Sequence, residues 1–171
     1  MKKYLLIIGT YVVRALLHIF CIFPVKNDRI IFNSMIWKQY SCNPRYITEY
    51  LQEHYPGKFD IIWAFKEPGK FEFLKERGIK VVKTRSLKFY FYSMTAKISM
   101  TNATSAAELP KRRKQFRINT WHGGGGGYKK IDYSSQAAFR ARLEMSEVDL
   151  FCTSSETSLH FTVREAFHNG I

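Results

Sequence analysis

Residues 59–82 read FDIIWAFKEPGKFEFLKERGIKVV, and this stretch predicts the fold. The apolar run from Phe59 to Phe65 has the length and composition of a buried strand. A Pro-Gly pair then begins a helix, and Gly78 ends it where a glycine often caps a helix. The next apolar run, Ile79 to Val82, predicts a second strand. A strand, a helix and a strand in so short a stretch indicate two parallel strands joined by a crossover helix.

The same alternation continues on both sides of this stretch. Further strands are predicted at residues 29–33, 97–102, 116–120 and 149–153, and further helices at 44–55, 86–96, 136–145 and 153–167. Apolar strands that alternate with helices predict a doubly wound α/β domain with a parallel sheet covered on both faces. In such sheets ligands bind beyond the carboxyl ends of the strands. No internal repeat interrupts the pattern.

The N-terminal segment needs a separate interpretation. A mostly apolar run extends from Tyr4 to Phe23, about 20 residues and long enough to span a bilayer as a helix. Arg14 and His18 interrupt it, and an arginine at the bilayer centre costs about 2.5–3.5 kcal/mol. Three alternatives remain: a helix in the membrane interface, a spanning anchor, and a helix packed on the domain. We divide the chain into this helix (1–28) and an α/β domain (29–171).

The chain of 171 residues carries 27 Lys and Arg against 14 Asp and Glu, a formal charge of +13. This excess favours an anionic partner, such as nucleic acid, an acidic membrane surface or a phosphorylated substrate. A basic cluster between two predicted strands is either a solvated loop or a membrane or polyanion site; it comprises Lys111, Arg112, Arg113, Lys114 and Arg117. Nucleic acid is not expected, because no recognised nucleic-acid motif is present. Three widely spaced cysteines indicate neither a disulfide framework nor a metal site.

A run of glycines follows one predicted strand, within NTWHGGGGGYKKIDYS at residues 119–134. It matches neither the dinucleotide-binding fingerprint nor a Walker A loop. Glycines nevertheless let backbone N–H groups approach an anion, so we predict a phosphate site at Gly123, Gly124, Gly125, Lys129 and Lys130. His122 is the candidate general base, since an unperturbed imidazole has a pKa of about 6.5. The alternative is a histidine that only forms a hydrogen bond at the strand end.

The stretch Asn119–Gly123, its glycine-rich continuation and Lys129-Lys130-Ile131 resemble the W-H-G…K-K signature of the CDP-glycerol glycerophosphotransferase family. These are teichoic-acid polymerases and primases of Gram-positive bacteria. The later segment at residues 149–167 resembles the strand and helix that follow this signature in the family. The resemblance covers residues 29–171.

The resemblance implies a GT-B architecture, in which two Rossmann-like domains face a cleft. It implies transfer of a polyol phosphate from a CDP-activated donor to a lipid-linked acceptor at the cytoplasmic face of the plasma membrane, with no cofactor or metal. His122 takes the place of the family's general base. The resemblance leaves the polyol, the acceptor and the oligomeric state open.

Two features depart from the family. Many members have a Thr-Pro or similar pair after W-H-G, where this chain has only glycine, and the sequence ends where a donor-binding domain is expected. Two alternatives remain: a GT-B glycosyltransferase that uses a nucleotide sugar, and a non-catalytic basic module that binds membranes.

We therefore expect the 171-residue chain alone to lack transferase activity, because one wall of the cleft is missing. The measurement is CMP release from a CDP-polyol by the purified chain. Turnover by the chain alone would contradict this expectation.

Overall fold

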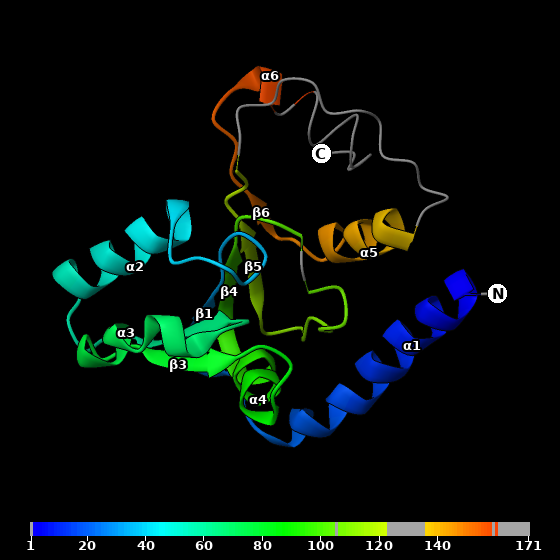
Figure 1. The fold of residues 1–171 in the computed structure, drawn as a ribbon, viewed down its shortest axis with the longest axis horizontal. Helices are drawn as coiled ribbons and strands as arrows, with labels where there is room; N and C mark the ends of the chain where they lie inside the picture. The colour runs from blue at the N-terminus through cyan, green and yellow to red at the C-terminus, as the bar shows by residue number, and fades with distance from the viewer. Residues whose placement is uncertain (1, 105, 123–135, 159, 161–171) are drawn as a thin grey trace.

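Six parallel strands form one sheet, in the order β3-β2-β1-β4-β5-β6, in a computed structural model of the protein (Figure 1). The structure describes residues 2–104, 106–122, 136–158 and 160. The strands are β1 (Lys26–Phe32), β2 (Asp60–Phe65), β3 (Lys80–Lys83), β4 (Ala96–Thr101), β5 (Phe116–Asn119) and β6 (Leu150–Phe151). All neighbouring pairs are parallel, which confirms the predicted doubly wound α/β sheet.

The helices alternate with the strands, except between β4 and β5, where the described residues form no helix. They are α1 (Lys2–Leu17), η1 (His18–Ile22), α2 (Cys42–His54), η2 (Pro68–Phe71), α3 (Phe73–Glu76), α4 (Leu87–Thr95), α5 (Gln136–Met145) and α6 (Glu156–Ser158). Ser86 caps α4 by accepting a hydrogen bond from the Phe89 amide at 3.2 Å, as predicted. The predicted helix at 68–77 is divided into the 3₁₀ turn η2 and the short α3. Most of the last predicted helix lies outside the described residues.

Alternating side chains of the central strands supply two apolar cores. Ile31 of β1 and Ile62 of β2 face α4, where they pack with Phe89 and Met94. The intervening residues face α2 and α3, and the stacked rings of Phe32, Trp63 and Phe65 fill that side. Burial on both faces explains why these strands have continuous apolar sequences rather than alternating ones.

Helix α1 packs on the α4 side of the sheet through only one of its faces. Leu17 is buried in that core, with Val13 and Phe20 packed against it. The opposite face is apolar and exposed; its members include Tyr4, Leu5, Ile8, Val12 and Leu16. The segment from Tyr4 to Ile22 has the length and composition to cross a membrane, which by itself is weak evidence that it does.

A buried ion pair joins the first three strands near their amino ends. Arg29 of β1 is 4% exposed, and its Nε donates to Asp60 Oδ2 at 2.8 Å. Lys80 of β3 donates to the other carboxylate oxygen at 2.5 Å. Burial acts to raise the pKa of Asp60, but the hydrogen bonds and charges of Lys80 and Arg29 outweigh it and hold this pKa below its usual value.

We expect Asp60→Asn to lower the free energy of unfolding at pH 7 by about 1–3 kcal/mol, because two cations lose their charged acceptor. A depressed pKa in the folded state means that this stabilisation is lost as the pH falls. The difference between variant and wild type therefore shrinks below about pH 4. The measurement is urea denaturation across this pH range.

Asp28→Asn is the control, because Asp28 is exposed and lies on β1 next to Arg29, the buried partner of Asp60. It is expected to change stability by less than about 0.5 kcal/mol. A stability difference between Asp60→Asn and wild type that stays constant down to pH 2 would contradict the lowered pKa of Asp60.

Candidate functional site

The carboxyl ends of β1 and β4 meet where the order of the strands reverses, and polar side chains tie them together. The backbone N–H of Asn33 donates to the backbone carbonyl of Met100 at 3.0 Å. The hydroxyl of Thr101 donates to the side-chain oxygen Oδ1 of Asn33, also at 3.0 Å. Asn102 is fully buried and accepts a hydrogen bond from the Met35 amide at 2.9 Å. This switch point is where doubly wound sheets usually bind ligands.

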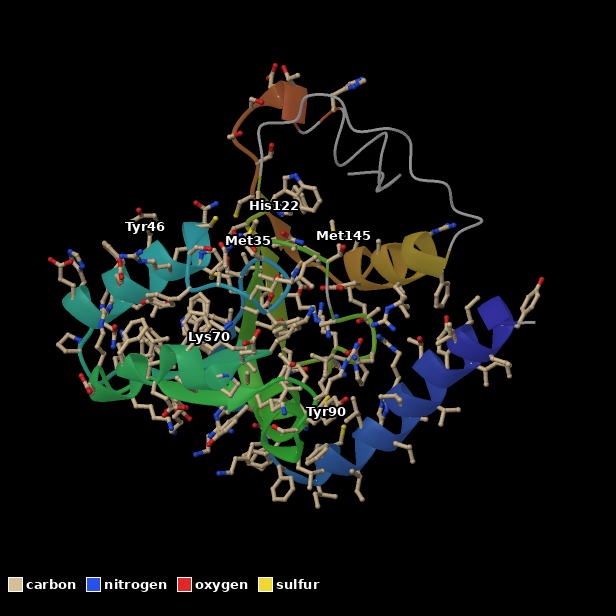
Figure 2. All side chains as sticks on the ribbon, viewed as in Figure 1. Met35, Tyr46, Lys70, Tyr90, His122 and Met145 are labelled. Carbon is tan, nitrogen blue, oxygen red and sulfur yellow. The ribbon has the colours of Figure 1, made fainter. Side chains whose placement is uncertain are left out.

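His122 lies directly after β5 and reaches this switch point. Its Nδ1 contacts the backbone carbonyl oxygen of Asn102, the residue whose side chain binds the backbone N–H of Met35 (Figure 2). A carbonyl oxygen only accepts, so Nδ1 carries the proton in this contact. The neutral ring then has its lone pair on Nε2, which is the form that a general base requires.

Trp121 fixes the backbone that presents His122. Its ring is 8% exposed and packs with Met145 of α5 and Phe151 of β6. Its amide donates to Asn119 Oδ1 at 2.8 Å, and its φ of 51° is left-handed. Packing and a local hydrogen bond together offset the cost of this conformation. The bend turns the chain immediately after the strand, so His122 faces the end of β4.

Left-handed backbone is concentrated at the carboxyl edge of the sheet. Every non-glycine residue with positive φ among those described follows β1, β3 or β5; these residues are Met35, Ile36, Trp37, Cys42, Arg85 and Trp121. The described glycines with positive φ, Gly57 and Gly78, lie at the opposite edge, just before β2 and β3. Such conformations cost about 1–3 kcal/mol each and persist where the surroundings impose them, commonly at functional sites.

The predicted phosphate site cannot be placed. Gly123, Gly124, Gly125, Lys129 and Lys130 all lie outside the described residues. The chain enters this segment from His122, at the carboxyl edge of the sheet.

Much of the predicted basic cluster is engaged within the protein. Lys111 pairs with Asp149, and Arg112 donates to the carbonyls of Phe23 and Met94 at 2.8 and 3.0 Å. Arg113 and Lys114 are exposed. A membrane or polyanion role for this cluster therefore depends mainly on its two exposed members.

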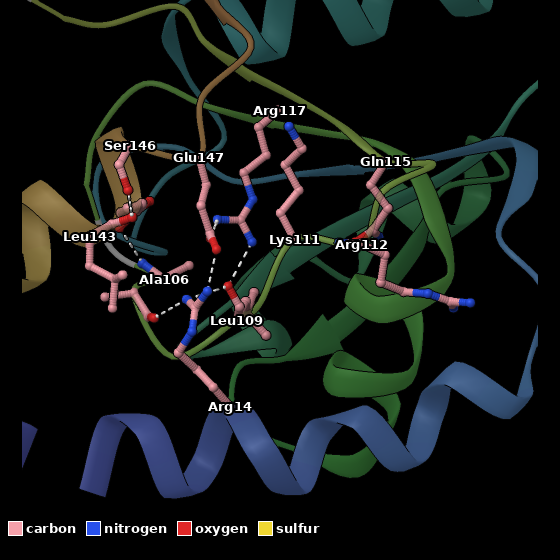
Figure 3. A network of polar contacts seen from close by, with 12 residues as sticks. Arg14, Ala106, Leu109, Lys111, Arg112, Gln115, Arg117, Leu143, Ser146 and Glu147 are labelled. Atoms are coloured by element: carbon pink, nitrogen blue, oxygen red, sulfur yellow. Dashed lines mark hydrogen bonds and ion pairs between the residues drawn. The ribbon is translucent and has the colours of Figure 1, made fainter. Parts of the chain in front are cut away.

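Arg117 and Arg14 share one carboxylate (Figure 3). Arg117 donates to Glu147 Oε2 and to the Leu109 carbonyl, both at 2.7 Å. Arg14 of α1 pairs with Glu147 Oε1 and donates to the carbonyls of Ala107 and Leu109 at 2.8 and 3.1 Å. Burial lowers the pKa of Arg117, and the nearby carboxylates of Glu147 and Glu144 oppose this effect. The network docks α1 onto the domain.

Asn33, Ser34, Asn102 and Glu147 were not identified from the sequence. The first three were detectable, because each is a polar residue directly after an apolar strand, in IIFNS and ISMTN. Glu147 carries no such signal, since its role depends on two arginines far away in the sequence.

Comparison with known proteins gives a family match over most of the chain. The family model for CDP-glycerol:poly(glycerophosphate) glycerophosphotransferase matches residues 15–169. Teichoic acid poly(glycerol phosphate) polymerase from Bacillus spizizenii is 37% identical over 102 residues, which are 58% of this chain and 25% of that protein. Teichoic acid glycerol-phosphate transferase from Staphylococcus aureus is 34% identical over 100 residues, again 58% of this chain and 25% of that protein.

Solved structures of the wall teichoic acid polymerase TagF have the same fold. One superimposes with a TM-score of 0.72 at 25% identity, covering 98% of this chain and 44% of that chain. A TagF variant soaked with CDPG gives a TM-score of 0.71 at 25% identity, covering 98% of this chain and 45% of that chain. The chain thus spans a quarter or less of the curated relatives that it matches and under half of the TagF structures.

Proposed function

Because the chain belongs to the CDP-glycerol:poly(glycerophosphate) glycerophosphotransferase family, we propose that it forms the acceptor-side Rossmann-like domain of a glycerol phosphate transferase. The donor is CDP-glycerol, and the acceptor is a lipid-linked chain that ends in a hydroxyl. The product extends a teichoic acid or a related cell-wall polymer. The observation that carries this proposal is the contact between His122 Nδ1 and the Asn102 carbonyl oxygen.

His122 acts as the general base in the proposed reaction. Its Nε2 takes the proton from the acceptor hydroxyl, and the hydroxyl oxygen attacks the β-phosphorus of the donor. A bond forms between that oxygen and phosphorus, the bridging P–O bond breaks, and CMP leaves with the bonding electrons. The Asn102 carbonyl keeps the lone pair on Nε2 and stabilises the imidazolium that forms.

In this proposal the glycine run supplies backbone N–H donors and the lysine pair supplies positive charge. Amides of Gly123, Gly124 and Gly125, with Lys129 and Lys130, stabilise the transferring phosphoryl group. Phosphoryl transfer depends mainly on positioning and electrostatic stabilisation, which suits a loop that presents amides and ammonium groups.

Helix α1 lies in the membrane interface on the cytoplasmic side, in the same proposal. A spanning orientation has to withdraw Arg14 from Glu147 and from two carbonyls, and breaking a buried ion pair costs about 3–5 kcal/mol. With Arg14 held, α1 stays against the domain and offers its exposed apolar face to lipid. Arg113 and Lys114 add attraction to anionic headgroups.

We expect His122→Ala to lower kcat by at least about 100-fold, the usual scale for loss of a general base. The assay is CMP release from CDP-glycerol by a TagF chimaera in which residues 15–169 of this chain replace the matching segment. His54→Ala is the matched control, because His54 is exposed and stacks on Tyr50 at the far end of α2. A kcat within a few-fold of the unsubstituted chimaera would rule out the base.

We also expect Ile8→Glu/Leu16→Glu to weaken binding to phosphatidylglycerol vesicles by at least about tenfold, because two exposed apolar side chains of α1 are replaced by carboxylates. Vesicle flotation measures the bound fraction. Tyr46→Glu/Phe73→Glu is the matched control, since these exposed side chains lie on α2 and α3, across the sheet from α1. Equal binding by both pairs would show that α1 does not contact lipid.

A further inference from the structure

A groove of about 310 Å³ opens at the carboxyl ends of β2 and β3. Its lining comes from the turn after β1, the residues that follow β2 and β3, helix α4 and the β4–β5 connection; the residues are Ile36, Trp37, Lys66, Thr84, Arg85, Phe89 and Glu108. The groove lies at the same edge of the sheet as His122. The groove is therefore on the side of the sheet where the proposed reaction takes place, and not at the amino-terminal edge.

The walls of the groove are held in place. The Lys66 amide donates to the Trp37 carbonyl at 2.9 Å, and the Thr84 amide donates to the Phe65 carbonyl at 2.9 Å. The ring of Trp37 is 7% exposed and meets Phe89 edge to face, with ring centroids 5.2 Å apart. The groove is thus preformed, which lowers the ordering cost of binding a ligand.

Two cations in the groove are poorly neutralised. Lys66 is exposed and forms no ion pair with any residue that the structure describes. Arg85 is 70% exposed, and its Nε lies 3.5 Å from a Glu108 oxygen. That carboxylate is 10% exposed and pairs more closely with Arg140, at 2.5 Å. The Glu108 carboxylate therefore neutralises mainly Arg140, and the groove keeps a net positive charge from Lys66 and Arg85.

The groove is continuous with the site of His122 along the chain. Met35 and His122 both contact Asn102, Met35 through its backbone N–H and His122 through Nδ1. The next two residues, Ile36 and Trp37, line the groove, and all three have left-handed backbone. This strained turn joins the two regions, and Arg85, which also lines the groove, is left-handed as well.

We propose that this groove binds a phosphodiester of the acceptor chain, one or more units away from the reacting hydroxyl. The inference rests on the proposed function and adds a subsite to it. A glycerol phosphate chain alternates anionic phosphates with short carbon segments. Lys66 and Arg85 bind the phosphate, and Ile36 and Trp37 contact the carbon segment. Such a subsite favours acceptors that already carry polymer over a single glycerol unit.

The test is calorimetric titration of the protein with a short synthetic glycerol phosphate oligomer. Lys66→Ala/Arg85→Ala is expected to weaken oligomer binding by at least about tenfold and to reduce its salt dependence. Lys58→Ala/Arg77→Ala is the matched control, because it removes the same charges just before β2 and β3, at the opposite edge of the sheet. This control is expected to bind the oligomer like the unsubstituted protein. CDP-glycerol and inorganic phosphate are titrated in parallel.

Oligomer affinity lost only in the groove variant, with CDP-glycerol affinity unchanged, supports the acceptor subsite. Equal losses in both variants indicate general charge attraction and overturn the proposal. A loss confined to CDP-glycerol or to inorganic phosphate, or no oligomer binding by the unsubstituted protein, overturns it as well. These outcomes are independent of the His122→Ala assay, so a failed subsite and a failed general base are distinguishable.

Discussion

The buried amide of Asn102 is the constraint on which the candidate site depends. It follows β4, is fully buried, and uses both ends of its side chain on the turn after β1, donating to Ser34 Oγ at 3.2 Å and accepting from the Met35 amide. Its backbone carbonyl then contacts His122, which follows β5. One residue thereby fixes the relative positions of three strand ends. A buried amide left without these partners costs about 1–3 kcal/mol, so the arrangement is strongly favoured over alternatives in which the turn is displaced.

Glu147 has the corresponding role for helix α1. It stands between α5 and β6 and binds Arg14 of α1 and Arg117 of β5. The carboxylate offsets part of the burial of both guanidinium groups, and the backbone carbonyls of Ala107 and Leu109 accept further N–H groups. Through this pairing the α/β domain fixes the orientation of α1. The apolar face of the helix therefore points away from the protein, and the segment that resembles a membrane span by composition carries its arginine on the inner side.

The strands and helices were predictable because their signals are local. Continuous apolar runs such as residues 59–65 fall on buried strands, and Gly78 ends a helix with a φ of 73°, as its position in the sequence suggests. His122 was predictable as a candidate because it follows such a run. Which members of the basic cluster are engaged inside the protein was not predictable, because in the sequence Arg117 looks the same as its exposed neighbours Arg113 and Lys114. Whether a charge is buried depends on partners that folding brings from elsewhere, here Glu147 and the Leu109 carbonyl.

The distribution of backbone strain links the site to the groove. Left-handed residues occur at both edges of the sheet, but the described ones differ in their side chains. Among the described residues, the positive-φ positions at the amino-terminal edge are glycines, Gly57 and Gly78, which avoid the cost. The carboxyl edge has larger side chains, including Trp37, Arg85 and Trp121, that pay it. A glycine at these positions would relieve the strain but would remove the ring or the cation. The side chains of Trp37 and Arg85 line the groove, and Trp121 places His122.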